Sequence, residues 1–383
     1  MDYLLSKEHK DFKDNMKTFS EKNVAPLAVV TDETGEFPWT TVAKMAEKNL
    51  MGLPFPVSSG GAGKDYRSFV AAVEEISKAC ASTGVILSTH IGLCSWPIYT
   101  YGNLQQKKEY LFPLAQGKKL GAFCLTEPDA GTDAGGIKTT AILKNGDWII
   151  NGRKIFITNG GEADIYIVTA ATEIDGSKKE LSSFIVDKSF EGFQVGKTEK
   201  KMGIKGSVTR EIIFNNCKVP KANMLGVKGK GLKIALSALN VGRIGIAAQA
   251  LGIAEGAFKR TIEYLRSRKQ FGKSLSTFQG LRFEAAEMAT RIEATKHLVY
   301  SAAWRLDQGL DISKEAAQAK LYASETAVYV TEKAVQLHGG YGYLQENEVE
   351  RMMRDAKITE IYEGTSQVQR MVIASWLFEK DMK

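Results

Sequence analysis

The spacing of hydrophobic residues divides the chain into three segments. Up to about residue 120, apolar side chains recur at three- and four-residue intervals, as at Phe12 and Met16, which is typical of helices. Short β-rich runs and turn dipeptides follow, and helical spacing then returns. We therefore predict an N-terminal helical domain (1–120), a middle β domain (121–226) and a C-terminal helical bundle domain (227–383).

The middle segment contains two strong hairpin signals, Asn145-Gly146 and Asn151-Gly152. Asn and Gly both tolerate positive φ, which two-residue hairpin turns require. An antiparallel β domain of about a hundred residues is therefore expected. Its predicted strands are Thr139–Leu143, Trp148–Ile150, Lys154–Thr158, Asp164–Ala170, Ser182–Asp187 and Glu211–Phe214.

The C-terminal segment has three long helical patterns and a shorter last one. Ser366 and Gln369 match a capping box, so the last helix should begin there. Strands and helices do not alternate as they do in a Rossmann fold, and the glycines at 226, 229 and 231 have the wrong spacing for its fingerprint. The predicted helices are 231–267, 278–306, 313–338 and 365–380.

Composition excludes several classes of protein. The chain has 383 residues, 44% of them hydrophobic and 25% charged, and a net charge of +7, which is ordinary for a globular protein. The modest basic excess suits an anionic ligand such as a nucleotide or coenzyme A. Because Lys and Arg are spread along the chain and matched by acids, a nucleic-acid surface is not indicated.

The cysteines, the histidines and the first residues indicate whether to expect disulfides, a metal site or a signal peptide. The four cysteines form no C-x-x-C pair, and the four histidines have no H-x-x-x-H spacing, so we expect neither a disulfide framework nor a metal site. Acids follow the first methionine at once, unlike a signal peptide, and we see no apolar run of about 18 residues. A cytoplasmic protein without a membrane span is expected.

Two turns in the middle segment could hold a flat or phosphorylated ligand. In 123–133, a strand runs into small polar residues whose N–H groups and hydroxyls could bind a ring edge or a phosphate. In 154–161, Phe156 precedes Thr158 by two residues on one strand face, so the ring could lie beside a flat ligand that the hydroxyl binds. Either turn could instead only cap its own backbone.

Two candidate segments lie in the C-terminal part. The cluster at 266–273 offers Arg268 for pyrophosphate recognition, although cations at a helix end also complement the helix dipole. The segment 336–343 has three glycines that permit close approach of a ligand; the alternative is a helix C-cap at Gly339 followed by a turn. His338, within this segment, is more often structural than catalytic in such a place.

Glu363 lies just before the last predicted helix. A lone loop glutamate is usually solvated. Between an aromatic residue and a glycine, however, its carboxyl group could be desolvated, which would raise its pKa above the reference of about 4.3 and suit it to general-base work.

Taken together, in this order and spacing, the candidate segments resemble the acyl-CoA dehydrogenase family over nearly the whole chain. Within the family, the sequence is similar to the short-chain, butyryl-CoA type from anaerobic bacteria. The most specific stretches are Leu125-Thr126-Glu127-Pro128, Ala130-Gly131-Thr132-Asp133, Arg268-x-x-Phe271-Gly272, Arg354-Asp355-Ala356-Lys357-Ile358 and Tyr362-Glu363-Gly364-Thr365.

The resemblance implies a mainly α fold with a central antiparallel β-barrel-like domain and a C-terminal four-helix bundle. It also implies FAD, bound between the β domain and the bundle, a homotetramer arranged as a dimer of dimers, and electron-transferring flavoprotein as redox partner. Some residues would reach the FAD of a neighbouring subunit, namely Arg268, Phe271, Gln336 and Gly340.

The resemblance further assigns site residues by match. The substrate side would comprise Thr132, Asn240, Arg243, Tyr362 and Gly364, with the hydroxyl of Thr158 near flavin N5. The cofactor-binding set is Phe123, Leu125, Thr126, Gly131, Thr132, Phe156, Ile157, Thr158, Arg268, Gln270, Phe271, Phe278, Gln279, Gln336, Leu337, Gly339, Gly340, Thr365 and Gln367.

Glu363 is the implied catalytic base, which removes the substrate α-proton while the β-hydrogen leaves as hydride to the flavin. In isovaleryl-type relatives the base precedes the arginine that matches Arg243, where this chain has Gly242; straight-chain substrates are therefore expected. Two residues depart from the pattern: Asn240 stands for the usual Asp, and Phe156 for the Trp of many relatives.

Three functions follow as alternatives. The first is oxidation of a short-chain acyl-CoA, or the reverse reduction of a 2-enoyl-CoA. The second is reduction of another 2-enoyl-CoA, aryl-substituted or acryloyl-type, in a complex with electron-transferring flavoprotein. A non-catalytic or nucleic-acid-binding member of the same fold is the third, which loss of Glu363 or a concentrated basic patch would favour.

Overall fold

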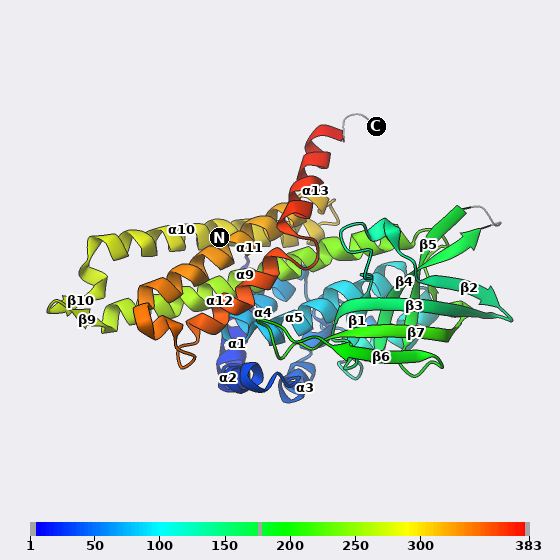
Figure 1. Cartoon of the computed structure of the whole chain (residues 1–383), viewed down its shortest axis with the longest axis horizontal. Helices are drawn as coiled ribbons and strands as arrows, with labels where there is room; N and C mark the ends of the chain where they lie inside the picture. Colours follow the sequence, from blue (N-terminus) through cyan, green and yellow to red (C-terminus); the bar gives the residue numbers. More distant parts are fainter. Residues whose placement is uncertain (1–4, 175–177, 380–383) are drawn as a thin grey trace.

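The computed structural model describes residues 5–174 and 178–379. Long helices run side by side along the molecule, the sheet lies at one end, and the N-terminal helices cover one side (Figure 1). This order of helices, sheet and helices agrees with the predicted fold class. Residues 1–4, which bear on the expected absence of a signal peptide, and Lys380, predicted to end the last helix, lie outside the described residues.

Helices fill the first segment of the chain, and three of them have side-chain N-caps. Asp65 begins α4 because its carboxylate accepts the backbone N–H of Ser68 at 2.9 Å. The segment also contains a π-helix, η3, whose seven residues are all buried. The elements are α1 (Lys7–Asn23), α2 (Ala25–Thr34), α3 (Trp39–Glu47), η1 (Leu50–Gly52), η2 (Val57–Ser59), α4 (Tyr66–Ala79), α5 (Ala81–Ser88), η3 (Thr89–Ser95), α6 (Trp96–Tyr101), α7 (Leu104–Gln106), η4 (Lys107–Leu111) and α8 (Phe112–Ala115).

The middle segment forms one sheet in the order β6-β7-β3-β2-β4-β5-β8, with β1 also paired to β4. Pairing is antiparallel except at β1–β4 and at a single β2–β4 pair, so the predicted antiparallel domain is mixed around the central strand β4. The elements are β1 (Gly121–Cys124), η5 (Ala134–Gly136), β2 (Thr140–Lys144), β3 (Asp147–Thr158), β4 (Ile165–Ile174), β5 (Lys178–Asp187), β6 (Phe193–Thr198), β7 (Thr209–Pro220), η6 (Lys221–Asn223) and β8 (Met224–Leu225).

Of the two hairpin signals, one is confirmed and one is wrong. Asn145-Gly146 joins β2 to β3 with φ of 50° and 90°. Asn151-Gly152 instead lies inside β3, at a shift in the register with β7 that marks a β-bulge. A Cβ at Gly152, where φ is 151°, would lie 2.7 Å from the Cα of Thr139. Glycine is therefore needed for close backbone approach, not for a turn.

The C-terminal helices agree with the predicted bounds to within about two residues, but the predicted capping box is wrong. Thr365, not Ser366, caps the last helix: its hydroxyl accepts the N–H of Val368 at 3.3 Å. The side chain of Gln369 turns to the carbonyls before the helix instead. The elements are α9 (Gly231–Ser267), β9 (Lys269–Gln270), β10 (Lys273–Ser274), η7 (Leu275–Thr277), α10 (Gln279–Asp307), α11 (Ser313–His338), η8 (Gly339–Tyr343), α12 (Val349–Lys357), η9 (Ile358–Glu360) and α13 (Ser366–Glu379).

Helix α9 forms the centre of the structure. By length and composition alone it could cross a membrane, contrary to the expectation that the chain has no such stretch, yet 78% of its most apolar 18-residue stretch is buried inside the protein. It contacts α4, α10 and α11. The burial of this stretch is that of a core helix.

A buried charge network ties the N-terminal helices to the bundle. The carboxylates of Glu74, Glu75 and Glu255 lie within 4.8 Å of one another. Three ammonium groups neutralise them: Lys13 at 2.5 Å from Glu74, Lys78 at 2.6 Å from Glu75, and Lys296 at 2.6 Å from Glu255. Because the lysines supply the counter-charge, the cluster is accounted for as an ion-pair network.

One arginine joins all three segments of the chain. Arg354 of α12 donates two hydrogen bonds to Asp32 of α2, at 3.0 and 2.6 Å, and further bonds to Glu350 and to the carbonyl of Met202. These acidic partners raise the pKa of Arg354. Its planar guanidinium group can serve several acceptors at once, which fixes how the segments meet.

Candidate active site

The loop between η9 and α13 is held in a strained conformation. Glu363 and Gly364 both have positive φ, 52° and 91°, and the left-handed region costs a residue other than glycine about 1–2 kcal/mol. The side-chain amide of Gln369 donates to both of their carbonyls, at 3.2 and 2.7 Å. The hydroxyl of Tyr362 donates to the side chain of Gln249 on α9. Tertiary contacts therefore determine where Glu363 points.

The carboxyl group of Glu363 lies against α9 at Gly242. A Cβ at that glycine would come 2.2 Å from Glu363 Oε2 and 2.6 Å from a methyl carbon of Leu93, so no larger residue fits. Among the described residues, Oε2 is buried without a hydrogen-bond partner. Burial raises the pKa of Glu363 to about 8, against the opposing charges of Lys320 and Arg243. A desolvated carboxylate of this kind is suited to take a proton.

The proposed substrate residues on α9 lie one helical turn apart and bond to each other. Arg243 donates to the side-chain oxygen Oδ1 of Asn240 at 2.8 Å, and the side-chain Nδ2 of Asn240 donates to the hydroxyl of Ser313 at 3.1 Å. Burial lowers the pKa of Arg243. The Asn at position 240 thus keeps a hydrogen-bonding role, and it brings no negative charge beside the arginine.

The turn after β1 is fastened to β3 by a buried ion pair. Lys154, fully buried, donates to the carbonyl of Leu125 at 3.0 Å and to Glu127 at 2.8 Å. Glu127 also accepts the N–H of Lys138 at 2.7 Å, and the backbone of residue 155 bonds to Thr126. These bonds bring together the 123–126 and 154–158 segments, the two middle-domain segments that the family resemblance assigns to the flavin.

This surface has the features that a flat ring needs. Phe156 stands out from β3 with 61% of its surface exposed and φ of 58°, at a shift in the register with β7. Phe123, in β1, and Leu125, just after β1, are buried, and the Gly131–Thr132 turn is exposed. An open aromatic face beside exposed turn N–H groups fits the isoalloxazine ring and the phosphates of a flavin nucleotide.

The π-helix η3 connects this surface to the base. A Cβ at Gly121, the first residue of β1, would lie 2.6 Å from Cys94, and Leu93 of the same π-helix packs against Gly242. The backbone N–H of Gly121 donates to His90 at 3.0 Å. Leu93 and Cys94 are adjacent in η3. Leu93 therefore contacts Gly242, against which the Glu363 carboxyl group lies, and Cys94 contacts the start of β1, the strand that leads to the ring surface.

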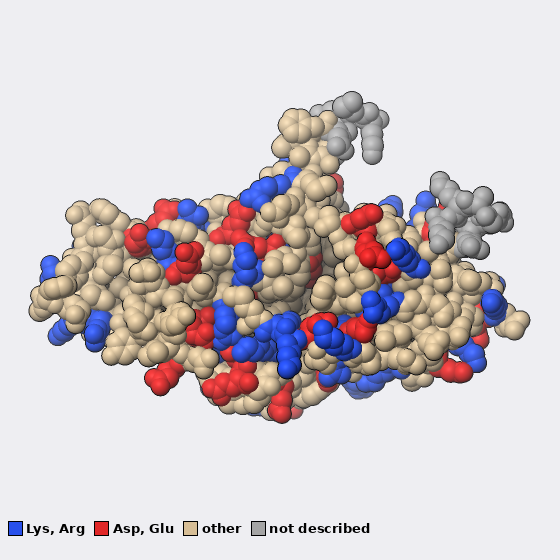
Figure 2. All heavy atoms as spheres, viewed as in Figure 1, with Lys and Arg blue, Asp and Glu red and all other residues tan. Residues whose placement is uncertain are grey.

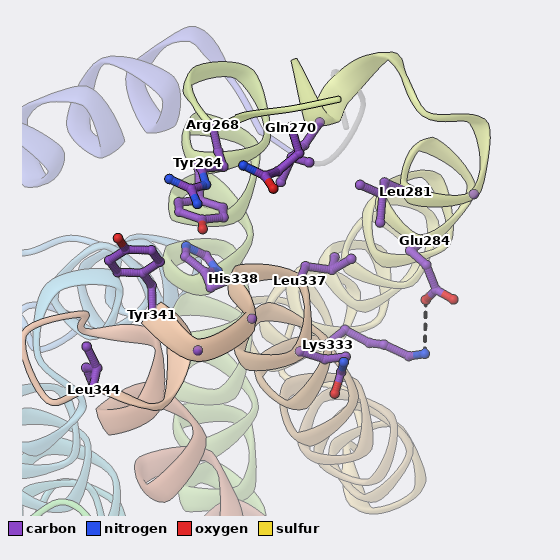
Figure 3. Close-up of a pocket in the computed structure, with 15 residues that line it drawn as sticks. Tyr264, Arg268, Gln270, Leu281, Glu284, Lys333, Leu337, His338, Tyr341 and Leu344 are labelled. Carbon is purple, nitrogen blue, oxygen red and sulfur yellow. Dashed lines mark ion pairs between the residues drawn. The ribbon is translucent and has the colours of Figure 1, made fainter. Parts of the chain in front are cut away.

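Most of the cofactor-binding residues predicted in the C-terminal segment lie in a second region, away from Glu363. A groove of about 970 Å³ at the far end of α9 is lined by Arg268, Gln270, Gln336, Leu337, Gly339 and Gly340. Figure 3 shows Arg268 and Tyr264 across from the end of α11, with Lys333 and Glu284 forming an ion pair at its other side. Arg268 lies 26 positions along α9 from Gly242, or about 39 Å at 1.5 Å per residue. The structure does not bring the two regions together within one chain.

Aromatic side chains line and flank the far groove. His338 stacks on Tyr264 with ring centroids 4.3 Å apart and bonds the Ala334 carbonyl at 2.7 Å, which is a structural role. Phe271 is 91% exposed with φ of 52°, and its ring lies 6.2 Å from that of Phe278. Gln279 begins α10 next to these rings.

Three residues hold the loop of Glu363: Lys320 and Gln249, which sequence reasoning missed, and Gln369, which it assigned to a helix cap. All three are fully buried. Lys320 left a signal, because it interrupts a face of α11 whose other members, such as Ala316 and Ala323, are small and apolar. Thr365 serves as the helix cap, and Gln367 is exposed.

A buried carboxyl group joined through one rigid element to a surface for a flat ring defines the site of a flavin-dependent oxidoreductase. Comparison with protein-family models matches residues 6–118, 122–217 and 229–378 to the N-terminal, middle and C-terminal domains of acyl-CoA dehydrogenases. The chain belongs to the acyl-CoA dehydrogenase family, and it is an oxidoreductase with FAD as its cofactor.

Relatives cover nearly the whole chain. The short-chain specific acyl-CoA dehydrogenase of Clostridium acetobutylicum is 51% identical, covering 99% of this chain and 100% of that protein. The caffeyl-CoA reductase-Etf complex subunit of Acetobacterium woodii is 44% identical, covering 98% and 99%. The structure of butyryl-CoA dehydrogenase from Megasphaera elsdenii superposes with a TM-score of 0.96 at 46% identity, covering 99% and 100%.

Proposed function

We propose that this protein catalyses α,β-dehydrogenation of a short-chain acyl-CoA, or the reverse reduction of a 2-enoyl-CoA, with Glu363 as the base. The observation that carries the proposal is the seat of the Glu363 carboxyl group on Gly242, where its Oε2 is buried without a partner. The likeness to short-chain and butyryl-CoA dehydrogenases supports the substrate class.

The proposed reaction needs a group that stabilises the thioester oxygen, a base for the α-proton and an acceptor for the β-hydride. A thioester α-proton is too weakly acidic for an ordinary carboxylate, so charge on the thioester oxygen must be stabilised as it develops. Among the described residues, the N–H of Glu363 donates to no protein acceptor and is free to bind that oxygen. The Glu363 carboxylate removes the α-proton. Bound FAD supplies the acceptor for the β-hydride and its two electrons.

The FAD site draws on the two regions of the chain described above. Phe123, Leu125, Thr126, Phe156 and Thr158 would hold the ring. The far groove, about 39 Å from Gly242, is too distant to serve the same FAD. We assign it to the FAD of a neighbouring copy in a homotetramer arranged as a dimer of dimers.

Helix α13 supports this assembly. It stands away from the body of the molecule (Figure 1), and Met371, Leu377 and Phe378 expose 61%, 58% and 76% of their surfaces. A second copy that covered this helix would remove the apolar surface from water.

We further propose electron-transferring flavoprotein as the redox partner, because a relative is named as a subunit of an Etf complex. The same relative supports reduction of an aryl-substituted 2-enoyl-CoA as the second candidate function. A nucleic-acid role is less well supported: on the face seen in Figure 2, basic side chains gather near the middle, with acidic side chains beside them.

The test is anaerobic reduction of the protein's flavin by a panel of acyl-CoAs, followed by absorbance with and without electron-transferring flavoprotein. Butyryl-CoA is expected to bleach the flavin, and the Glu363→Gln variant serves as the matched control. Unchanged absorbance across all short-chain members, with FAD intact, contradicts the short-chain assignment. Oxidation of the reduced protein by cinnamoyl-CoA but not by crotonyl-CoA would favour the aryl-substituted alternative.

A further inference from the structure

Lys320 is a buried cation in an apolar part of the bundle. It lies in the first half of α11 with 0% of its surface exposed, on the helix face that also carries Ala316, Ala323 and Ala327. A lysine is almost never fully buried unless its ammonium group has a partner. The burial of this ammonium group therefore needs a structural explanation.

The ammonium group of Lys320 is directed at the loop of the base. It donates to the carbonyl of Gly364 at 2.7 Å, and Gly364 directly follows Glu363 in the left-handed turn. Of the described residues, none places a carboxylate within ion-pair distance of this ammonium group. Its positive charge is attracted by Glu363 and repelled by Arg243, and burial lowers the pKa of Lys320 to about 8.

We propose that Lys320 is the positioning residue for the base: its ammonium group fixes the turn through the Gly364 carbonyl, and its charge favours the carboxylate form of Glu363. The inference rests on the proposed role of Glu363. A protonated ammonium group nearby stabilises an anion more than the neutral acid, and it does so strongly where water is excluded.

Other charged groups also face Glu363 and must be counted. Arg243 approaches from α9, and the Tyr362 phenol lies in the same loop; Glu360 acts on Lys320. Arg243 already donates to the neutral side chain of Asn240. Without the charge of Lys320, Arg243 is the only cation left among these groups, so the carboxyl group should hold its proton to higher pH.

The variants that test the inference separate charge from hydrogen bonding. Lys320→Gln keeps a donor for the Gly364 carbonyl but removes the charge, Lys320→Arg keeps the charge, and Lys320→Met removes both. Lys314→Met is the matched control on the same helix, where the ammonium group lies 3.9 Å over the Trp376 ring.

Two readouts apply to each FAD-loaded variant. Infrared difference spectroscopy across pH follows the carboxyl band of Glu363, identified by its absence in Glu363→Gln, and needs no substrate. Stopped-flow measurement of flavin reduction by butyryl-CoA gives the pH profile of the reaction. A merely structural lysine would not move the titration midpoint.

We expect Lys320→Gln to raise the Glu363 titration midpoint by at least about one pH unit, and to slow flavin reduction about tenfold below the wild-type midpoint. Lys320→Arg and Lys314→Met should keep the wild-type midpoint. An unchanged midpoint in Lys320→Gln overturns the inference, as does an equal rise in Lys320→Arg. If Lys320→Met does not fold, the Gln and Arg variants still decide.

The two readouts distinguish failure of this inference from failure of the proposed function. If no acyl-CoA reduces the wild-type flavin, the proposed reaction is wrong, while the infrared titration still reports whether Lys320 acts on Glu363. If butyryl-CoA reduces the wild type and the midpoint is insensitive to Lys320, the reaction stands and the positioning role is wrong.

Discussion

Replacing Glu363 by Gln should make the protein more stable at neutral and alkaline pH. The pKa of Glu363 is raised from its ordinary value of 4.5 to about 8 in the folded protein, chiefly by burial. Between these values the unfolded chain is ionised and the folded protein holds the proton, so folding takes up a proton and stability falls as pH rises. At about 1.4 kcal/mol per pH unit, the loss at pH 7 is about 3 kcal/mol.

Glutamine has nearly the same shape and no charge, so the Glu363→Gln variant escapes this penalty. The assay is thermal unfolding of the FAD-loaded wild type and variant between pH 5 and 9, with FAD in excess. The difference in Tm should be small at pH 5 and grow to about 4 °C at pH 7, the variant being the more stable. A difference that stays constant with pH would refute the reasoning, because it would show that the carboxyl group keeps its ordinary pKa.

Three further variants test the structure around the site. In Gly242→Ala the new Cβ displaces the Glu363 carboxyl group, so stopped-flow reduction of the flavin should slow at least about tenfold with FAD content unchanged; an unaffected rate would contradict the seat on this glycine. Arg354→Met leaves acidic partners on α2 and α12 unpaired, and urea unfolding should show a loss of about 3 kcal/mol. Lys154→Met leaves Glu127 buried without its cation, so FAD should dissociate more readily in a fluorescence titration; unchanged FAD affinity would show that this pair does not hold the ring surface.

Much of the fold follows from local pattern. Periodicity gave the long helices, because each buries a continuous face, and Asn145-Gly146 gave a hairpin because both residues need positive φ. Asn151-Gly152 has the same local signature, but the requirement at Gly152 comes from Thr139 on the neighbouring strand. A local rule cannot detect a neighbour that only the folded sheet brings near.

The site shows the same division between local and tertiary causes. The loop sequence suggested that Glu363 could be desolvated, but the groups that enclose it come from α9 and α11, so their identity depends on the tertiary fold. In the sequence, Lys320 is recognisable as the lone cation on an apolar helix face. Its partner is not recognisable, because the Gly364 carbonyl carries no signal in the sequence.

The most direct measurement of the central claim compares wild-type protein with Glu363→Gln in anaerobic single-turnover reduction by butyryl-CoA. Both should bind FAD, because the carboxyl group lies outside the proposed ring surface. We predict that the wild-type flavin bleaches within seconds and that the variant flavin stays oxidised over the same period. Reduction of the variant at a rate within about tenfold of the wild type would contradict the assignment of Glu363 as the base.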